Sequence, residues 1–273
     1  MKKLISGILV LTLVVSLVAV GCGGESTDGD KPYEYKEEDT KIIELSGQTK
    51  LILRNTNGGI HIEGSDATDR IHVAIAKTVR SYSLEDAQEH MGDIEASDYK
   101  TAEEVHIEVE HPMTSVRNYQ ADFAITLPIH FDFEITVGNG SIELDNVEST
   151  ETKAGVGNGY IGADMTLADS CAVDFEVGNG NVHADMTLMD SCSMEFRVGN
   201  GNIEIKIPEN TSTQVKASVG NGEITYAGLS FENIEVSLTE LEGSLGDGNS
   251  NIILAVGNGD IQLRGKPGAA AQE

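Results

Sequence analysis

The chain has 273 residues, of which 39% are hydrophobic, but aromatic residues make up only 5% and Trp is absent. Any core therefore has to be built mostly from aliphatic side chains. The formal net charge of −27 repels a phosphate backbone, so nucleic acid is excluded as an expected partner. The same charge opposes lying flat on an anionic membrane. It attracts cations or basic partners, or simply keeps an exposed protein soluble.

The N-terminus is typical of an export signal. Lys2 and Lys3 precede an apolar stretch from Leu4 to Val20, and small residues follow it. The run Ala19-Val20-Gly21-Cys22 resembles the lipobox of bacterial lipoproteins. This resemblance implies that residues 1–21 are a signal peptide and that Cys22 carries an acyl (palmitate-type) lipid anchor in the membrane. The alternative is an uncleaved transmembrane anchor at the short limit for spanning a bilayer. Both interpretations place the rest of the chain outside the cytoplasm.

Three further segments follow. Residues 22–37 are rich in Gly, Ser, Asp and Pro and show no periodicity, which predicts a flexible tether. Residues 38–265 are predicted to form one β domain, divided into irregular coils (38–136) and regular repeats (137–265). A disordered tail is expected over 266–273.

The first part of the domain alternates strands with one helical insertion. Strands are predicted at Lys50–Arg54, Ile60–Glu63, Ile71–Val79, Val105–Glu110 and Phe123–Leu127. Between them, Ser83-Leu84-Glu85-Asp86 has the pattern of a capped helix start, and this helix is expected to run to about Ala96.

The second part repeats. Val-Gly-Asn-Gly starts at Val137, Val156, Val177, Val198, Val219 and Val256, and three successive intervals are 21 residues. The last interval, of 37 residues, is expected to hold one coil plus an insertion around 243–251. Within each unit, apolar residues alternate with polar ones on both sides of the Asn-Gly pair. Strict alternation predicts strands with one buried face. Asn-Gly predicts a tight turn, because both residue types tolerate positive φ.

Two architectures fit this pattern: a β-solenoid, in which each unit is one stacked coil, and a meander, in which each Asn-Gly closes a hairpin. The near-constant unit length favours a β-solenoid with coils of about 21 residues. It would stack the motif asparagines as a ladder of turns, which are Asn139, Asn158, Asn179, Asn200, Asn221 and Asn258.

The segments 51–62, 123–142 and 243–263 resemble the bacterial β-solenoid family called "putative adhesin". The resemblance spans about residues 40–265 and implies a solenoid fold. It transfers no catalytic or ligand-binding residues.

Candidate sites are few. Cys171 and Cys192 lie one unit apart and point inward, either as a disulfide between stacked coils or as two small buried thiols. Parallel Cβ vectors favour the thiols. The pattern predicts no metal site and no cofactor, since two Cys without paired His disfavour zinc and no calcium-binding loop is present. The Asn-Gly turns are either a ligand-binding edge or a purely conformational feature.

These patterns predict a non-catalytic cell-envelope lipoprotein whose rigid solenoid binds a protein or glycan surface. The adhesion role comes from the resemblance alone. An alternative is a structural or regulatory protein that contacts another envelope protein. A polysaccharide-active enzyme is disfavoured, because Arg197 and Arg264 are the only arginines from Val137 to Gly265.

Overall fold

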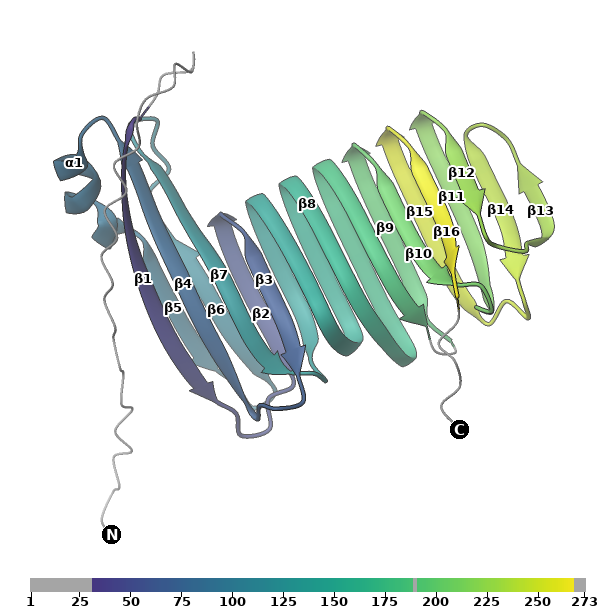
Figure 1. The fold of residues 1–273 in the computed structure, drawn as a ribbon, viewed down its shortest axis with the longest axis horizontal. Helices are drawn as coiled ribbons and strands as arrows, with labels where there is room; N and C mark the ends of the chain where they lie inside the picture. Colours follow the sequence, from purple (N-terminus) through teal and green to yellow (C-terminus); the bar gives the residue numbers. More distant parts are fainter. Residues whose placement is uncertain (1–30, 189–190, 268–273) are drawn as a thin grey trace, which may run out of the picture.

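The computed structural model describes residues 31–188 and 191–267. Strands make up most of this part of the chain, which confirms the all-β prediction, and they form an elongated, solenoid-like stack (Figure 1). In chain order the elements are β1 (Tyr33–Glu44), β2 (Lys50–Asn57), β3 (Ile60–Ser65), β4 (Arg70–Ser81), α1 (Leu84–Glu89), the 3₁₀ turn η1 (Met91–Asp93), β5 (Glu95–Lys100), β6 (Glu104–Glu110), β7 (Asn118–Pro128), β8 (Asp132–Leu188), β9 (Ser193–Asn200), β10 (Ile203–Pro208), β11 (Thr213–Asn221), β12 (Ile224–Ala227), β13 (Glu232–Val236), β14 (Glu240–Leu245), β15 (Ser250–Asn258) and β16 (Ile261–Lys266).

Parallel coils form the middle of the stack. β8 winds through several coils without a break, and β9 then pairs with it in parallel, so that Phe196 lies opposite Phe175. These partners are 21 residues apart, as the repeat predicts. The sheet as a whole is mixed, however, because antiparallel strands close both ends of the stack.

At the N-terminal end, the order of the coils in space differs from their order in the chain. β2 and β3 pair with β8 on one side, but on the other side they pair with β6 and β7, which come later in the sequence. β4 and β1 then add antiparallel strands beyond β7, and β5 adds one beyond β6. Residues 38–136 are therefore only partly coils, because the outermost strands are reached by chain reversal instead of a further turn of the stack.

The C-terminal end has the same kind of intercalation. β15 pairs in parallel with both β9 and β11, and β16 pairs with both β10 and β12. The last coil, 250–266, thus lies between coils 193–208 and 213–227. The 37-residue interval is explained by this return path and by an antiparallel hairpin of β13 and β14. The insertion expected around 243–251 is in fact this hairpin, which begins earlier, at Glu232.

Two predicted boundaries were wrong. α1 begins as predicted, with the Ser83 side chain accepting a hydrogen bond from the backbone N–H of Asp86, but it ends at Glu89 instead of near Ala96. The following residues form η1 and then β5, because antiparallel pairing with β6 satisfies their backbone groups and overrides helix propensity. β1 begins at Tyr33, inside the predicted tether, because it pairs with β4 along its whole length. The predicted signal peptide, Cys22 and residues 268–273 lie outside the described residues.

The corners of the coils depend on glycine more than on asparagine. Gly180 has a φ of +141°, and a Cβ there would lie 1.6 Å from the carbonyl oxygen of Gly159 in the neighbouring coil. Among the described residues, the non-glycine residues with positive φ are Asn146, Ser170, Ser191 and Asn233, so the motif asparagines are not in that conformation. The predicted reason for Asn in the motif was therefore wrong, and its role must come from the side chain.

We expect Gly180→Ala to destabilise the protein by roughly 2–5 kcal/mol, from overpacking and a left-handed backbone together. Gly155→Ala is the matched control, since a Cβ at Gly155 meets nothing within 4 Å and its φ is not in the left-handed region. Chemical denaturation measures both. Equal loss of stability in the two variants would contradict the role assigned to the corner.

The core is a column of inward side chains from both faces, mostly aliphatic. Its largest members include Phe175 and Phe196, which are fully buried and stack with their ring centroids 4.8 Å apart and their planes within 11°.

We expect Phe175→Ala to leave a void inside the stack and to cost roughly 3–5 kcal/mol of unfolding free energy. Thermal melting and denaturant titration would measure the loss. An unchanged melting temperature would show that the inward assignment of this strand is wrong.

Candidate functional site

The motif asparagines form a ladder along one edge of the stack. The side-chain Nδ2 of each donates to Oδ1 of the next at 2.7–2.8 Å, in the order Asn221, Asn258, Asn200, Asn179, Asn158, Asn139 and Asn57. Asn258 enters between Asn200 and Asn221 because the last coil is intercalated there. Each side chain within the ladder both donates and accepts, so its polar groups serve chain stacking. This favours a structural role for the asparagine side chains over a ligand-binding edge.

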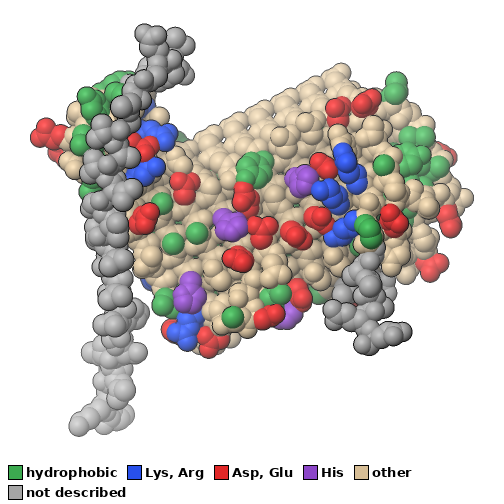
Figure 2. All heavy atoms as spheres, in the orientation of Figure 1, with side chains coloured by type: hydrophobic (Ala, Val, Ile, Leu, Met, Phe, Trp, Pro, Cys, Tyr) green, Lys and Arg blue, Asp and Glu red, His purple; other side chains and the backbone are tan. Residues whose placement is uncertain are grey.

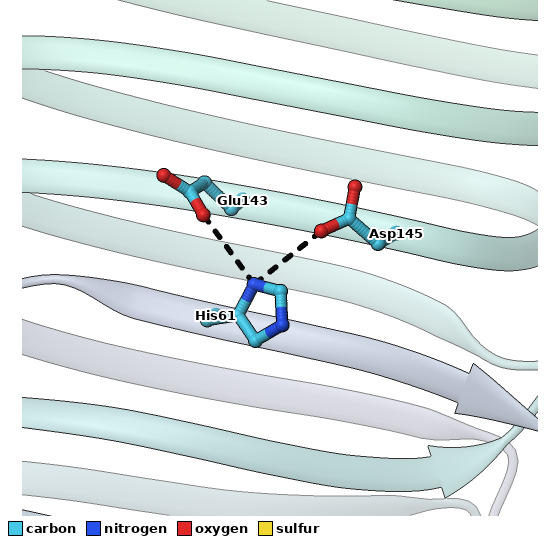
Figure 3. Close-up of side chains that lie close together, drawn as sticks. All are labelled: His61, Glu143 and Asp145. Carbon is cyan, nitrogen blue, oxygen red and sulfur yellow. Dashed lines mark ion pairs between the residues drawn. The ribbon is translucent and has the colours of Figure 1, made fainter.

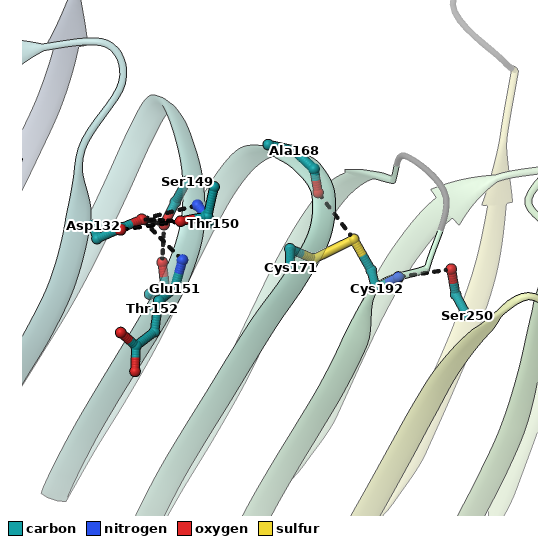
Figure 4. Close-up of a disulfide and its surroundings, with 9 residues drawn as sticks. All are labelled: Asp132, Ser149, Thr150, Glu151, Thr152, Ala168, Cys171, Cys192 and Ser250. Atoms are coloured by element: carbon teal, nitrogen blue, oxygen red, sulfur yellow. Dashed lines mark hydrogen bonds between the residues drawn. A yellow bond between two sulfur atoms is a disulfide. The ribbon is translucent and has the colours of Figure 1, made fainter.

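The opposite corner carries the disulfide (Figure 4). Cys171 and Cys192 are bonded to each other, with Cα atoms 4.5 Å apart, and both are buried. The preference for two separate thiols was wrong. The short stacking distance lies within the range that disulfides tolerate, and a residue of positive φ, Ser170 or Ser191, directly precedes each cysteine. The backbone N–H of Cys192 also donates to Ser250 Oγ at 3.1 Å, which ties this corner to the intercalated coil.

A second polar network fixes α1 against the N-terminal end. Arg117 donates to both carboxylate oxygens of Asp86, from Nε at 2.8 Å and from Nη2 at 2.6 Å, and Ser81 Oγ donates as well. These hydrogen bonds, that from Arg117 first, lower the pKa of Asp86 to about 2. Nearby, Tyr119 Oη donates to Asp93 at 2.8 Å. Burial and this bond raise the pKa of Tyr119.

A groove of about 620 Å³ lies where the N-terminal end of the stack meets the edge that carries the asparagine ladder. Its wall carries hydroxyl, amide, imidazole and guanidinium groups, from residues that include Thr56, Thr78, Arg80, His111, Arg117, Asn118 and Gln120. Two apolar side chains of the loop between β6 and β7 are exposed, Met113 at 88% and Val116 at 47%, and Met113 also lines the groove. The groove thus combines many hydrogen-bonding groups with exposed apolar surface, which is typical of a binding site. Its two arginines are each paired with a carboxylate, Arg80 with Glu34 and Arg117 with Asp86.

A three-residue cluster lies on the outer surface formed by the second strands of the coils (Figure 3). His61 on β3 points between Glu143 and Asp145 of β8, with Nδ1 3.4 Å from one carboxylate oxygen of each. All three side chains are about half exposed, at 45%, 40% and 50%. The hydroxyl of Tyr160 donates to the other oxygen of Glu143. In the space-filling view, Asp, Glu and His side chains recur across this face (Figure 2).

Sequence reasoning missed this cluster because His61 and Glu143 are far apart in the chain. One signal could have found it. Asn57 and Asn139 occupy equivalent corners, and His61 and Glu143 each follow their asparagine by the same number of residues. Aligning the degenerate first corner with the later ones therefore predicts the contact.

The chain matches a protein family over well more than half of its length. The model of that family, described as Toastrack DUF4097, covers residues 86–264. The chain belongs to this Toastrack family. The matched range excludes β1 to β4 and begins inside α1, so it covers β5 to β7, the central stack and the C-terminal end as far as β16. None of the curated proteins compared with the chain matches it.

Solved structures give weaker likenesses. A "putative cell adhesion protein" from Clostridium sporogenes is 15% identical, covers 85% of this chain and 100% of its own, and has a TM-score of 0.46. A "putative adhesin" from Bacteroides fragilis is 11% identical, with coverage of 83% and 96% and a TM-score of 0.34. A "putative lipid binding protein" from Parabacteroides distasonis is 11% identical, with the same coverage and a TM-score of 0.32. These names describe those proteins and are not carried over to this Toastrack chain.

The described residues include no helix that is both long and apolar enough to cross a membrane.

We expect the anchoring of α1 to weaken in acid. The pKa of Asp86 is lower in the folded protein than in the unfolded chain, where it is about 3.9. Its contribution is therefore complete above that value and is lost as pH falls towards about 2. Hydrogen exchange over residues 84–93, corrected for intrinsic rates, should show protection falling in this window.

Asp86→Asn is the control, because an amide does not titrate there. It should be less protected at pH 5 than the wild type and lack the step. Unchanged protection of the wild type between pH 5 and pH 2 would contradict the assignment.

Proposed function

We propose that the protein is a non-catalytic cell-envelope protein, anchored through an acylated Cys22, that presents a rigid β stack and binds an extracytoplasmic ligand at one end of it. The observation that carries the proposal is the groove beside β7. Hydrogen-bonding side chains line its wall, and the exposed Met113 projects from the loop between β6 and β7. The N-terminal export pattern supports the location.

Rigidity supports the presentation role. The coils are joined by backbone ladders, by the asparagine ladder and by the Cys171–Cys192 disulfide. A stack of this kind moves little when a partner binds, so the ordering cost of association is small. It also places β7, which carries part of the groove lining, towards one end and the β13–β14 hairpin at the other (Figure 1).

The ligand class follows from the lining. Amide, hydroxyl and guanidinium donors next to exposed apolar side chains fit a glycan or an extended peptide from another envelope protein. Such a ligand would replace water at the groove while its apolar parts cover Met113.

The test is site-specific photo-crosslinking in intact cells with the tagged, lipid-anchored full chain. One variant carries the crosslinker at Met113 beside the groove, and a matched one carries it at Leu238 on the distal end, which is 77% exposed. We expect a partner to be crosslinked from the position of Met113 and not from that of Leu238. Glycan or matrix would indicate adhesion, and a single dominant envelope protein would indicate the structural or regulatory role.

A variant whose residues 1–22 are replaced by a cleavable export signal without the lipidation motif controls for the anchor. It should leave the membrane fraction and lose whatever capture depends on membrane placement. Equal capture at Met113 and Leu238, or capture at neither, would contradict binding at the groove.

A further inference from the structure

We propose that His61, Glu143 and Asp145 form a binding site for a divalent transition-metal ion, and that zinc is the ion their geometry fits best. The site lies on the outer surface of the stack and joins β3 to β8, and its three residues are not among those that line the groove. It goes beyond the proposed binding function and does not depend on it.

The spacing of the donor atoms suits zinc. His61 Nδ1 is 3.4 Å from Glu143 Oε2 and 3.4 Å from Asp145 Oδ2, and all three ligand atoms lie within 4.8 Å of one another. Tetrahedral zinc with bonds of roughly 2.0–2.2 Å separates neighbouring ligand atoms by about 3.4 Å. By contrast, 3.4 Å is longer than a good N–H···O hydrogen bond. The two separations from His61 therefore match a metal-binding distance, the third is within 4.8 Å, and His61 Nδ1 is not hydrogen-bonded to either carboxylate.

The ligand atoms are also preorganised to bind an ion. His61 Nδ1 is itself shielded from solvent and has no hydrogen-bond partner, although the rest of the ring is exposed. A buried nitrogen without a partner is uncommon and calls for an explanation such as an ion. Tyr160 occupies one oxygen of Glu143 through its hydroxyl and leaves Oε2 facing His61. An outer hydrogen bond of this kind orients metal-binding carboxylates.

The donor set and the charge decide between ions. One imidazole and two carboxylates suit zinc, whereas calcium takes six to eight oxygen ligands and rarely an imidazole. Two carboxylates offset a 2+ charge, and Glu63, in register with Asp145, adds to the local negative potential. Three protein ligands on an exposed face leave a fourth position for water, or for a donor group from a partner.

A similar pair of a histidine and a carboxylate lies elsewhere on the same face, but it lacks the second carboxylate. His183 lies opposite Glu204, with Nδ1 3.3 Å from its carboxylate, just as His61 lies opposite Glu143. The position equivalent to Asp145 is Lys206, however, and Arg264 already pairs with Glu204 at 3.2 Å. A cation in place of the second carboxylate opposes metal binding. The position of His183 is therefore a control, within the same chain, for metal binding at His61.

The experiment is calorimetric titration of zinc into the full chain, purified in detergent without a histidine tag, together with the visible absorption spectrum of added cobalt(II). We expect one zinc per chain and a tetrahedral-type cobalt spectrum. His61→Ala, and Asp145→Lys, which copies the control constellation, should each weaken zinc binding by at least about 10–100-fold. His183→Ala should bind as the wild type does.

Melting curves recorded with chelator separate loss of the site from loss of the fold, because these exposed substitutions should leave metal-free stability nearly unchanged. Zinc should then raise the melting temperature of the wild type and of His183→Ala only. The proposal is overturned if the wild type binds no zinc, if His61→Ala and Asp145→Lys bind it unchanged, or if His183→Ala loses binding equally.

Discussion

The close approach of successive coils at the glycine corners is the constraint on which the rest of the structure depends. Gly180 lies so near the carbonyl of Gly159 that no side chain fits between them, and the same contact recurs at the other corners. The backbone amide of Gly201 can then donate to the carbonyl of Asn258 at 2.8 Å, and the side chains of Asn179 and Asn158 meet at 2.8 Å. The parallel coils keep this corner-to-corner register, with asparagine opposite asparagine.

Identical corners also explain why the order of coils in space differs from their order in the chain. Any Val-Gly-Asn-Gly corner presents the same backbone and the same amide to its neighbours, so Asn258 fits between Asn200 and Asn221 as well as a sequential coil would. The chain can pass over one position and return to it later. Antiparallel strands cover β6 and β7 of the outermost coil at the N-terminal end and β11 at the C-terminal end, which protects the hydrogen-bonding edges of these strands.

Much of the fold could be predicted because its signals are local. Alternation identified the strands, and the spacing of the corners identified the 21-residue register of Phe175 on Phe196. The intercalated coils could not be predicted, because the sequence of one repeat unit does not specify which other unit it stacks against. The short α1 was mispredicted for a related reason: β5 gains backbone partners from β6, and that long-range pairing outweighs local helix preference.

The candidate sites also differ in whether their signals are local in the sequence. The roles of the corner asparagines were misread because local turn chemistry suggested a backbone role, whereas the stack uses their side chains. The cluster of His61, Glu143 and Asp145 is invisible along the chain but follows from the register once the first corner is aligned with the later ones. In a stacked fold, each outward position forms a column, so chemistry arises between residues one coil apart. An isolated histidine in such a sequence should therefore be judged by the residues at equivalent positions in neighbouring coils: a carboxylate pair there offers further metal ligands, and a lysine, as at Lys206, opposes metal binding.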